Sequence, residues 1–108
     1  MIEPLTPSEL KAWLDDETRE SPVVIDVREA WEHALVKVDA ALHMPMQTVP
    51  SRLGDLDAGR PHVLMCHHGM RSYQVAQFLK NQGFDRVYNL TGGIDAWAEE
   101  VEPQLARY

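Results

Sequence analysis

The sequence predicts an α/β domain with a mainly parallel central sheet and helices on both faces. Strand-like runs alternate with helix-like segments along the chain, which is the order typical of this fold class. One run, residues 23–27 (VVIDV), is apolar on both faces except at Asp26, as expected of a central parallel strand. The 108 residues contain no internal repeat or interdomain linker, so we expect a single domain over residues 1–108.

The first half of the chain carries one strong helix signal before this strand. Thr6 can cap a helix, Pro7 suits the first helical position, and Glu9 completes a capping box. We therefore expect a helix over about residues 7–16. Two weaker candidates follow the 23–27 strand: a strand over residues 40–44 (AALHM), stopped by Pro45, and a short helix over residues 49–56 (VPSRLGDL), weakened by Gly54.

Signals are stronger in the second half. Residues 62–66 (HVLMC) predict a strand, and residues 71–82 (RSYQVAQFLKNQ) predict a helix with apolar side chains on one face and amide side chains on the other. Gly83 occupies the position of a left-handed C-terminal cap, with Phe84 placed to pack on Leu79. The remaining elements are a strand over residues 86–90 (RVYNL) and a helix over residues 94–101 (IDAWAEEV) that Pro103 ends.

The single cysteine, Cys66, lies where the 62–66 strand ends, in the segment CHHGMRS. Ligands of open parallel sheets gather at the carboxyl ends of the strands. A tight turn there, permitted by Gly69, can aim backbone N–H groups inward as an anion-binding nest, and the next helix, beginning near Ser72, adds positive partial charge. Together with Arg71 these groups are expected to lower the pKa of the thiol. From these residues alone, a nucleophilic Cys66 and a buried structural cysteine are equal alternatives.

Composition and charge exclude several classes of function. A net charge of −7 argues against nonspecific nucleic-acid binding, and no apolar stretch reaches the roughly 20 residues of a membrane helix. The first residues carry no secretory signal, and one cysteine permits neither an internal disulfide nor a dithiol mechanism, so we expect a cytoplasmic protein. Adjacent residues seldom converge on one tetrahedral ion, and a papain-like protease needs a histidine and an orienting amide from distant segments. We therefore expect neither a metal site nor a papain-like protease in the cluster of Cys66, His67, His68 and His62.

Four segments of the chain resemble single-domain rhodaneses, the family of thiosulfate and persulfide sulfurtransferases. They are VVIDVREAWE (residues 23–32), AALHMP (40–45), CHHGMRS (66–72) and NLTGGIDAW (89–97). In that order they are similar to the family's first-strand segment, the end of its next strand, its active-site loop and its closing element. The resemblance covers essentially the whole chain and implies a single rhodanese-like domain.

The resemblance also implies a chemistry, in which Cys66 accepts sulfane sulfur from thiosulfate or a persulfide and passes it on to cyanide or a thiol. Backbone N–H groups of the loop would cradle the Cys66 persulfide, and Arg71 would bind the anionic donor. His67 and His68, at the lip of the loop, would either tune substrate choice or remain solvated. No cofactor is implied. The implied substrate-binding set is the rest of the loop: His67, His68, Gly69, Met70, Arg71 and Ser72.

Two other functions stay open. One is a phosphatase or arsenate reductase of the related cell-cycle phosphatase type, in which one more residue separates the cysteine from the arginine. The four residues 67–70 between Cys66 and Arg71 favour sulfur over phosphate. The other is a noncatalytic module that binds a partner or relays sulfur, although retention of both Cys66 and Arg71 speaks against a dead module.

One segment departs from the family pattern. Where the family usually reads Gly-His-Ile-x-Gly-Ala, this chain reads VKVDAA over residues 36–41, so the resemblance does not predict the local course of the backbone. Among the remaining residues, Asp26 and Arg28 are expected to anchor the turn after the 23–27 strand through hydrogen bonds or an ion pair. Trp97 is expected to pack in the core.

Overall fold

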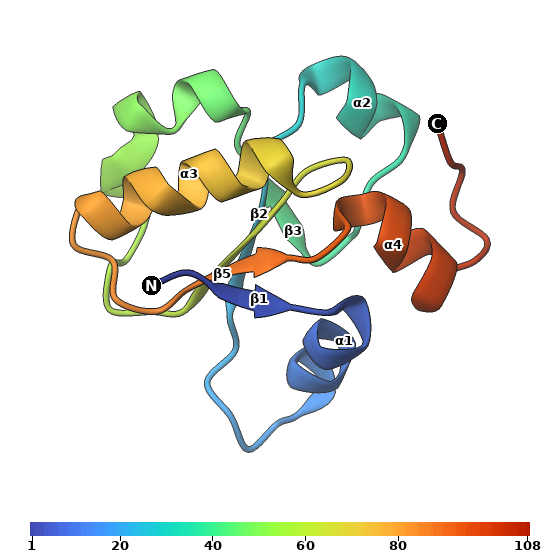
Figure 1. The fold of residues 1–108 in the computed structure, drawn as a ribbon, viewed down its shortest axis with the longest axis horizontal. Coiled ribbons are helices and arrows are strands. Elements are labelled where there is room, and N and C mark those ends of the chain that lie inside the picture. Colours follow the sequence, from blue (N-terminus) through green and yellow to red (C-terminus); the bar gives the residue numbers. More distant parts are fainter.

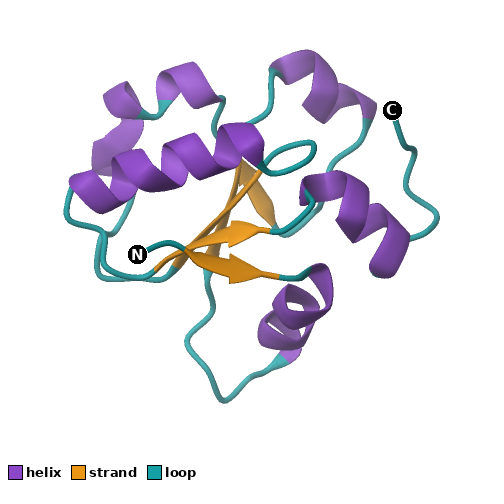
Figure 2. Ribbon diagram, viewed as in Figure 1, coloured by secondary structure: helices purple, strands orange, loops and turns teal.

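The computed structural model describes residues 1–108, which form one five-stranded sheet with helices on both sides (Figures 1 and 2). Every strand pair is parallel, and the strand order is β1-β5-β4-β2-β3. The predicted α/β class is therefore confirmed. The strands are β1 (Glu3–Leu5), β2 (Val23–Asp26), β3 (Ala41–His43), β4 (His62–Met65) and β5 (Val87–Leu90).

The helices divide between the two faces of the sheet. They are α1 (Pro7–Asp15), α2 (Ala30–Leu35), α3 (Met70–Asn81) and α4 (Gly93–Glu100), with two short 3₁₀ helices, η1 (Met46–Thr48) and η2 (Pro50–Asp55). One face is covered by α3 and the 3₁₀ helices, and the other by α1 and α4 (Figure 1). None of these helices combines the length and the apolar character needed to cross a membrane.

Alternating side chains of the central strands supply a core on each face. In β4, Leu64 packs in the cluster that includes Val75 of α3, whereas Val63 packs in the opposite cluster with Trp97 of α4. Burial of side chains of this size contributes roughly 1.5–3 kcal/mol each. The same alternation turns Cys66, the residue after β4, toward the α3 face. The core position expected for Trp97 is confirmed, since only 3% of it is exposed.

Two helix ends match the local signals in the sequence. At the start of α1, the Glu9 N–H donates to Thr6 Oγ1 (3.1 Å) and the Thr6 N–H donates to Glu9 Oε1 (2.8 Å), which completes the capping box. Beyond the end of α3, Gly83 has a φ of 95°, and the Phe84 N–H donates to the Leu79 carbonyl (3.1 Å). Both predicted caps are thus confirmed: Thr6 fixes the start of α1, and Gly83 fixes the end of α3.

β1 and α2 have no counterpart among the elements predicted from the sequence. β1 has only three residues, includes Pro4 and pairs with β5 alone at the edge of the sheet, so no alternating pattern marks it. α2 has six residues, of which only Glu32 is buried, so it has no apolar face to recognise. Its first turn is closed by the Glu29 N–H, which donates to Glu32 Oε2 (3.0 Å).

The segment that departs from the family pattern, residues 36–41, links α2 to β3 without needing glycine. No residue of the chain other than glycine has a positive φ, so the backbone here suits ordinary side chains. Val36 and Val38 are buried in the core that faces α1 and α4. The Ala41 N–H donates to the Val38 carbonyl (3.0 Å), which turns the chain into β3.

An ion pair between Asp26 and Arg28 anchors the turn after β2. Both side chains are fully buried, with 2.7 Å between Arg28 Nη2 and Asp26 Oδ2, and the Arg28 N–H also donates to Asp26 Oδ1 (3.0 Å). The expected anchor is confirmed. The remaining Arg28 donors reach the Val36 carbonyl (2.7 Å), the Glu32 carbonyl (3.2 Å) and the Tyr108 hydroxyl (2.9 Å). A buried guanidinium needs this many acceptors, because an unpaired donor would lose its hydration without replacement.

Candidate active site

The loop that carries Cys66 leaves the carboxyl end of β4 and leads into α3, where it appears in yellow in Figure 1. α3 begins at Met70, earlier than the start near Ser72 that the sequence suggested. The reason is Gly69, which has a φ of 114° and serves as the N-terminal cap, so that the chain turns sharply and enters the helix at once. The first turn of α3 therefore lies directly against the thiol.

The loop is also fixed from the side by the start of α4. The Ile94 N–H donates to the Cys66 carbonyl (2.8 Å) and the Asp95 N–H donates to the His67 carbonyl (3.2 Å). A side chain at Gly93 would collide with these two carbonyls. These two carbonyls thus point away from the thiol toward α4, whereas the Gly69 N–H faces the thiol.

The thiol of Cys66 accepts hydrogen bonds from its own loop. The Gly69 N–H lies 3.1 Å from Sγ, the Ser72 Oγ lies 3.3 Å from it, and only 1% of the residue is exposed. Burial raises the pKa of the thiol, but the hydrogen bonds from the Ser72 side chain and from loop N–H groups outweigh it, so the pKa lies below its ordinary value. The site therefore favours the thiolate.

A neighbouring strand holds Ser72 in place. The single proton of the Ser72 hydroxyl has two acceptors in reach, and the Asn89 Oδ1 atom at 2.6 Å is nearer than the Cys66 Sγ atom at 3.3 Å. The other end of the amide, Asn89 Nδ2, donates to the Gly69 carbonyl (3.0 Å). Sequence reasoning missed Asn89. A signal was present, because Asn89 lies near the carboxyl end of β5, next to the end of β4.

Arg71 differs from what was expected of it, since its guanidinium does not stand free at the thiol. Its Nη1 and Nη2 atoms donate to the two oxygens of Glu32 in α2, at 2.7 and 2.9 Å. This pairing balances the charge that the sequence suggested would act on Cys66. Hydrogen bonds, rather than a free arginine, therefore lead in lowering the thiol pKa. The Arg71 side chain keeps 35% of its surface exposed, so it still borders the cavity.

Glu32 is a second residue that sequence reasoning missed. Its side chain is only 3% exposed, and its oxygens accept four hydrogen bonds: two from Arg71, one from the Glu29 N–H and one from the Tyr108 hydroxyl (2.8 Å). These bonds, led by those from Arg71, lower the pKa of Glu32 to about 2. The carboxylate is thus charged at every physiological pH, and it holds Arg71, one of the residues that line the cavity.

His67 and His68 differ in how far their side chains are exposed to solvent. His68 has 64% of its side chain exposed, whereas His67 is half-buried between the rings of His68 and Tyr108, with a centroid distance of 3.9 Å to each. Burial and the neighbouring His68 lower the pKa of His67, which keeps it neutral. His67, His68 and Asp95 bring one possible metal ligand each within 4.8 Å, but both Asp95 oxygens already accept from Arg107 at 3.0 Å.

The loop surrounds a cavity of about 390 Å³. Gly69 and Ser72, the other two predicted loop residues, lie behind the sulfur and contact it directly. The cavity exceeds what one sulfur atom needs and admits a small donor or acceptor. It is lined by Cys66, His67, His68, Met70, Arg71 and Gln74.

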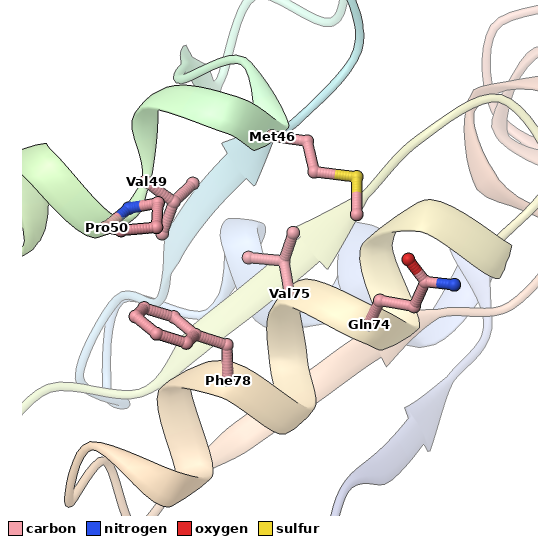
Figure 3. Close-up of a pocket in the computed structure, with 6 residues that line it drawn as sticks. All are labelled: Met46, Val49, Pro50, Gln74, Val75 and Phe78. Atoms are coloured by element: carbon pink, nitrogen blue, oxygen red, sulfur yellow. The ribbon is translucent and has the colours of Figure 1, made fainter.

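A smaller apolar cavity of about 200 Å³ lies next to it, between α3 and the 3₁₀ helices (Figure 3). Figure 3 shows Val75 and Phe78 of α3 facing Met46, Val49 and Pro50 across this space. Gln74 lies at its edge and also lines the cysteine cavity. Gln74 is thus a residue that the two cavities share.

Replacing Ser72 by alanine is expected to raise the pKa of Cys66, because it removes one of the groups that stabilise the thiolate. The measurement is the rate of alkylation by iodoacetamide against pH, and the wild-type midpoint should lie below the roughly 8.5 of a free thiol. The control is Ser51→Ala, since the Ser51 hydroxyl bonds the Thr48 carbonyl instead (3.0 Å). A wild-type midpoint at or above about 8.5 would contradict the assignment, and so would an unchanged midpoint in Ser72→Ala.

Comparison with known sequences supports the resemblance. The model of the rhodanese-like domain matches residues 6–100. A protein of Allochromatium vinosum named sulfurtransferase is 39% identical over 87 residues, which cover 81% of each chain. A protein of Actinobacillus pleuropneumoniae named thiosulfate sulfurtransferase GlpE is 37% identical over 89 residues, which cover 82% of each chain.

Comparison with solved structures gives the same result. A rhodanese-like domain protein from Staphylococcus aureus superposes with a TM-score of 0.83 at 30% identity, and the match covers 99% of both chains. The shared region therefore includes the whole sheet, all four helices and the cysteine loop.

Proposed function

This chain belongs to the rhodanese-like domain family, and on that premise we propose that it is a sulfurtransferase that carries sulfane sulfur on Cys66. The observation that carries the proposal is the environment of the thiol, which accepts the Gly69 N–H at 3.1 Å in a loop that lines a cavity of about 390 Å³. A thiolate stabilised by hydrogen bonds and reachable by a small anion is what sulfur transfer requires.

In the first step the Cys66 thiolate attacks the outer sulfur of thiosulfate. A bond forms between Sγ and that sulfur, the sulfur–sulfur bond of thiosulfate breaks, and sulfite leaves with the bonding electron pair. A persulfide donor reacts in the same way and leaves as a thiolate. The product on the enzyme is an anionic Cys66 persulfide, which the N–H groups of residues 67–72 would cradle.

In the second step an acceptor attacks the outer sulfur of the persulfide. Cyanide gives thiocyanate, and a thiolate gives a new persulfide, while Cys66 Sγ leaves as a thiolate and is ready for another cycle. The first step leaves the negative charge on the outer sulfur of the persulfide, and the second step returns it to Cys66 Sγ, so the charge stays within the loop. Donors such as the Gly69 N–H and the Ser72 hydroxyl therefore serve both half-reactions.

The other loop residues would bind substrate. Arg71 stands at the cavity wall and would meet the charge of the donor and of the leaving sulfite with the part of its guanidinium that Glu32 leaves exposed. His67, neutral and packed, would form a fixed wall, and His68, largely exposed, would face solvent at the entrance. Met70, with 80% exposure, would contact acceptors from outside.

The experiment that tests this function is intact-mass analysis after exposure of the reduced protein to thiosulfate. Wild type should gain one sulfur, about 32 Da, and lose it when cyanide or a thiol is added. Absence of the adduct with thiosulfate and with a small persulfide would refute the proposal. Hydrolysis of an aryl phosphate by the same protein, without sulfur loading, would favour the phosphatase alternative.

A further inference from the structure

The C-terminal segment after α4 returns to the active site. Figure 1 shows it running back alongside α4 so that the C-terminus lies close to α2. Arg107 fixes it to α4 through two hydrogen bonds to Asp95, both 3.0 Å long. The next residue, Tyr108, then reaches the candidate site from outside residues 6–100, the part that matches the family model.

The Tyr108 hydroxyl connects two arginines through one carboxylate. It accepts from Arg28 Nη1 (2.9 Å) and donates to Glu32 Oε1 (2.8 Å). The same oxygen of Glu32 accepts from Arg71 Nη2 at 2.9 Å. The charge of Arg28 is itself paired with Asp26, so it is the hydrogen bond from the Tyr108 hydroxyl that satisfies part of the negative charge of Glu32 and leaves the charge of Arg71 less completely balanced than in an isolated pair.

The ring of Tyr108 makes a separate contact. It stacks on His67 with a centroid distance of 3.9 Å and an interplanar angle of 6°, and it meets Trp31 edge to face at 5.9 Å. His67 in turn lines the cavity that contains the thiol. One side chain thus contacts the cavity-lining His67 with its ring and, with its hydroxyl, contacts Glu32, the partner of the cavity-lining Arg71.

We propose that Tyr108 is a positioning residue for the anionic sulfur donor, acting through Glu32 on Arg71. The proposal rests on the proposed sulfurtransferase function and adds to it a residue that lies outside the family match. Its hydroxyl holds the carboxylate in the orientation that presents Arg71 to the cavity. Without the hydroxyl, Glu32 loses one of its four donors, reorients, and holds Arg71 less precisely and with its whole charge.

The first test does not depend on sulfur transfer. Cys66 is alkylated with iodoacetate, an anion, and with iodoacetamide, which is neutral and of similar size. The ratio of the two rates cancels the thiolate fraction and reports the positive charge that Arg71 offers in the cavity. In Tyr108→Phe, which keeps the ring on His67, this ratio should fall about three- to tenfold. In Tyr88→Phe, the control on β5 whose ring packs on Trp13 at 5.0 Å, it should not change.

The second test measures sulfur loading. With thiosulfate as donor, Tyr108→Phe should raise KM about three- to tenfold with little change in kcat, and the melting temperature should fall slightly because Arg28 and Glu32 each lose one partner. In a Glu32→Gln background the Tyr108→Phe change should have no further effect, because the hydroxyl acts through the carboxylate.

The outcomes separate the two proposals. An unchanged alkylation ratio in Tyr108→Phe would overturn the role of Tyr108. So would an equal fall of both alkylation rates together with a fall in melting temperature, which would describe a merely structural residue. If wild type fails to load sulfur while the ratio still falls in Tyr108→Phe, the sulfurtransferase function is refuted and the positioning of Arg71 by Tyr108 stands.

Discussion

Replacing Cys66 by serine is expected to reduce sulfur transfer by more than about a thousandfold, to the level of the uncatalysed reaction. A hydroxyl at that position stays protonated at neutral pH, attacks sulfur poorly and cannot carry a persulfide. The fold should persist, because the serine oxygen can accept the Gly69 N–H that now bonds Sγ, and the change costs about 1–3 kcal/mol. The measurements are thiocyanate formation from thiosulfate and cyanide, and thermal melting.

A second substitution controls for the packing of the loop. Cys66→Ala also removes the nucleophile but cannot accept the Gly69 hydrogen bond, so both variants should be inactive while Cys66→Ala melts at a different temperature from Cys66→Ser. Thiocyanate production by a folded Cys66→Ser protein at a rate comparable to wild type would refute covalent catalysis at this residue.

Arg71→Ala should weaken the use of an anionic donor about tenfold to a hundredfold, and weaken attack by a neutral acceptor thiol much less. It should also lower the stability of the fold by about 1–3 kcal/mol, because Glu32, only 3% exposed, would lose two of its donors. The experiment preloads Cys66 with sulfur and times loading and unloading separately. Equal losses in the two steps would remove Arg71 from the donor site and make it a brace of the loop.

The double variant Arg71→Ala with Glu32→Gln separates binding from bracing. Removing the carboxylate together with its partner leaves no buried unpaired charge, so stability should recover in part while donor use stays weak.

The pH dependence of the stability gives an independent check. The pKa of Glu32 is lowered from 4.5 to about 2 in the fold, so its contribution to stability is complete above about pH 4.5 and is lost as the pH falls toward 2. This acid-sensitive contribution should be absent from the double variant.

The features that could be predicted from the sequence are those formed by residues that lie close together along the chain. The loop from Cys66 to Ser72 is a short segment in which glycine, cysteine and arginine have fixed spacing, and the caps at Thr6 and Gly83 depend on neighbours three to five residues away. Elements without such local signals were missed. α2 buries only one side chain, and β1 is an edge strand of three residues.

The residues that surround the loop could not be predicted in the same way. Glu32 lies 39 residues from Arg71 along the chain, and Tyr108 lies 76 residues from Glu32. Nothing in their own neighbourhoods distinguishes a carboxylate or a tyrosine on the surface from one that contacts the cysteine loop or its partners. As a result, Arg71 looked free to act on the thiol, whereas in the folded chain Glu32 occupies both of its terminal nitrogens.

The hydrogen bonds from Ile94 and Asp95 to the loop carbonyls bear on how this cysteine loop can be engineered. A loop whose N–H groups converge on an anion must turn its carbonyls outward, and the first N–H groups of a helix lack partners within that helix. Each set of groups thus satisfies the other. A cysteine loop grafted alone onto a foreign α/β scaffold would leave its outward carbonyls unpaired. The smallest transplantable module is therefore the loop of residues 66–72 together with the glycine pair and helix start at 92–95.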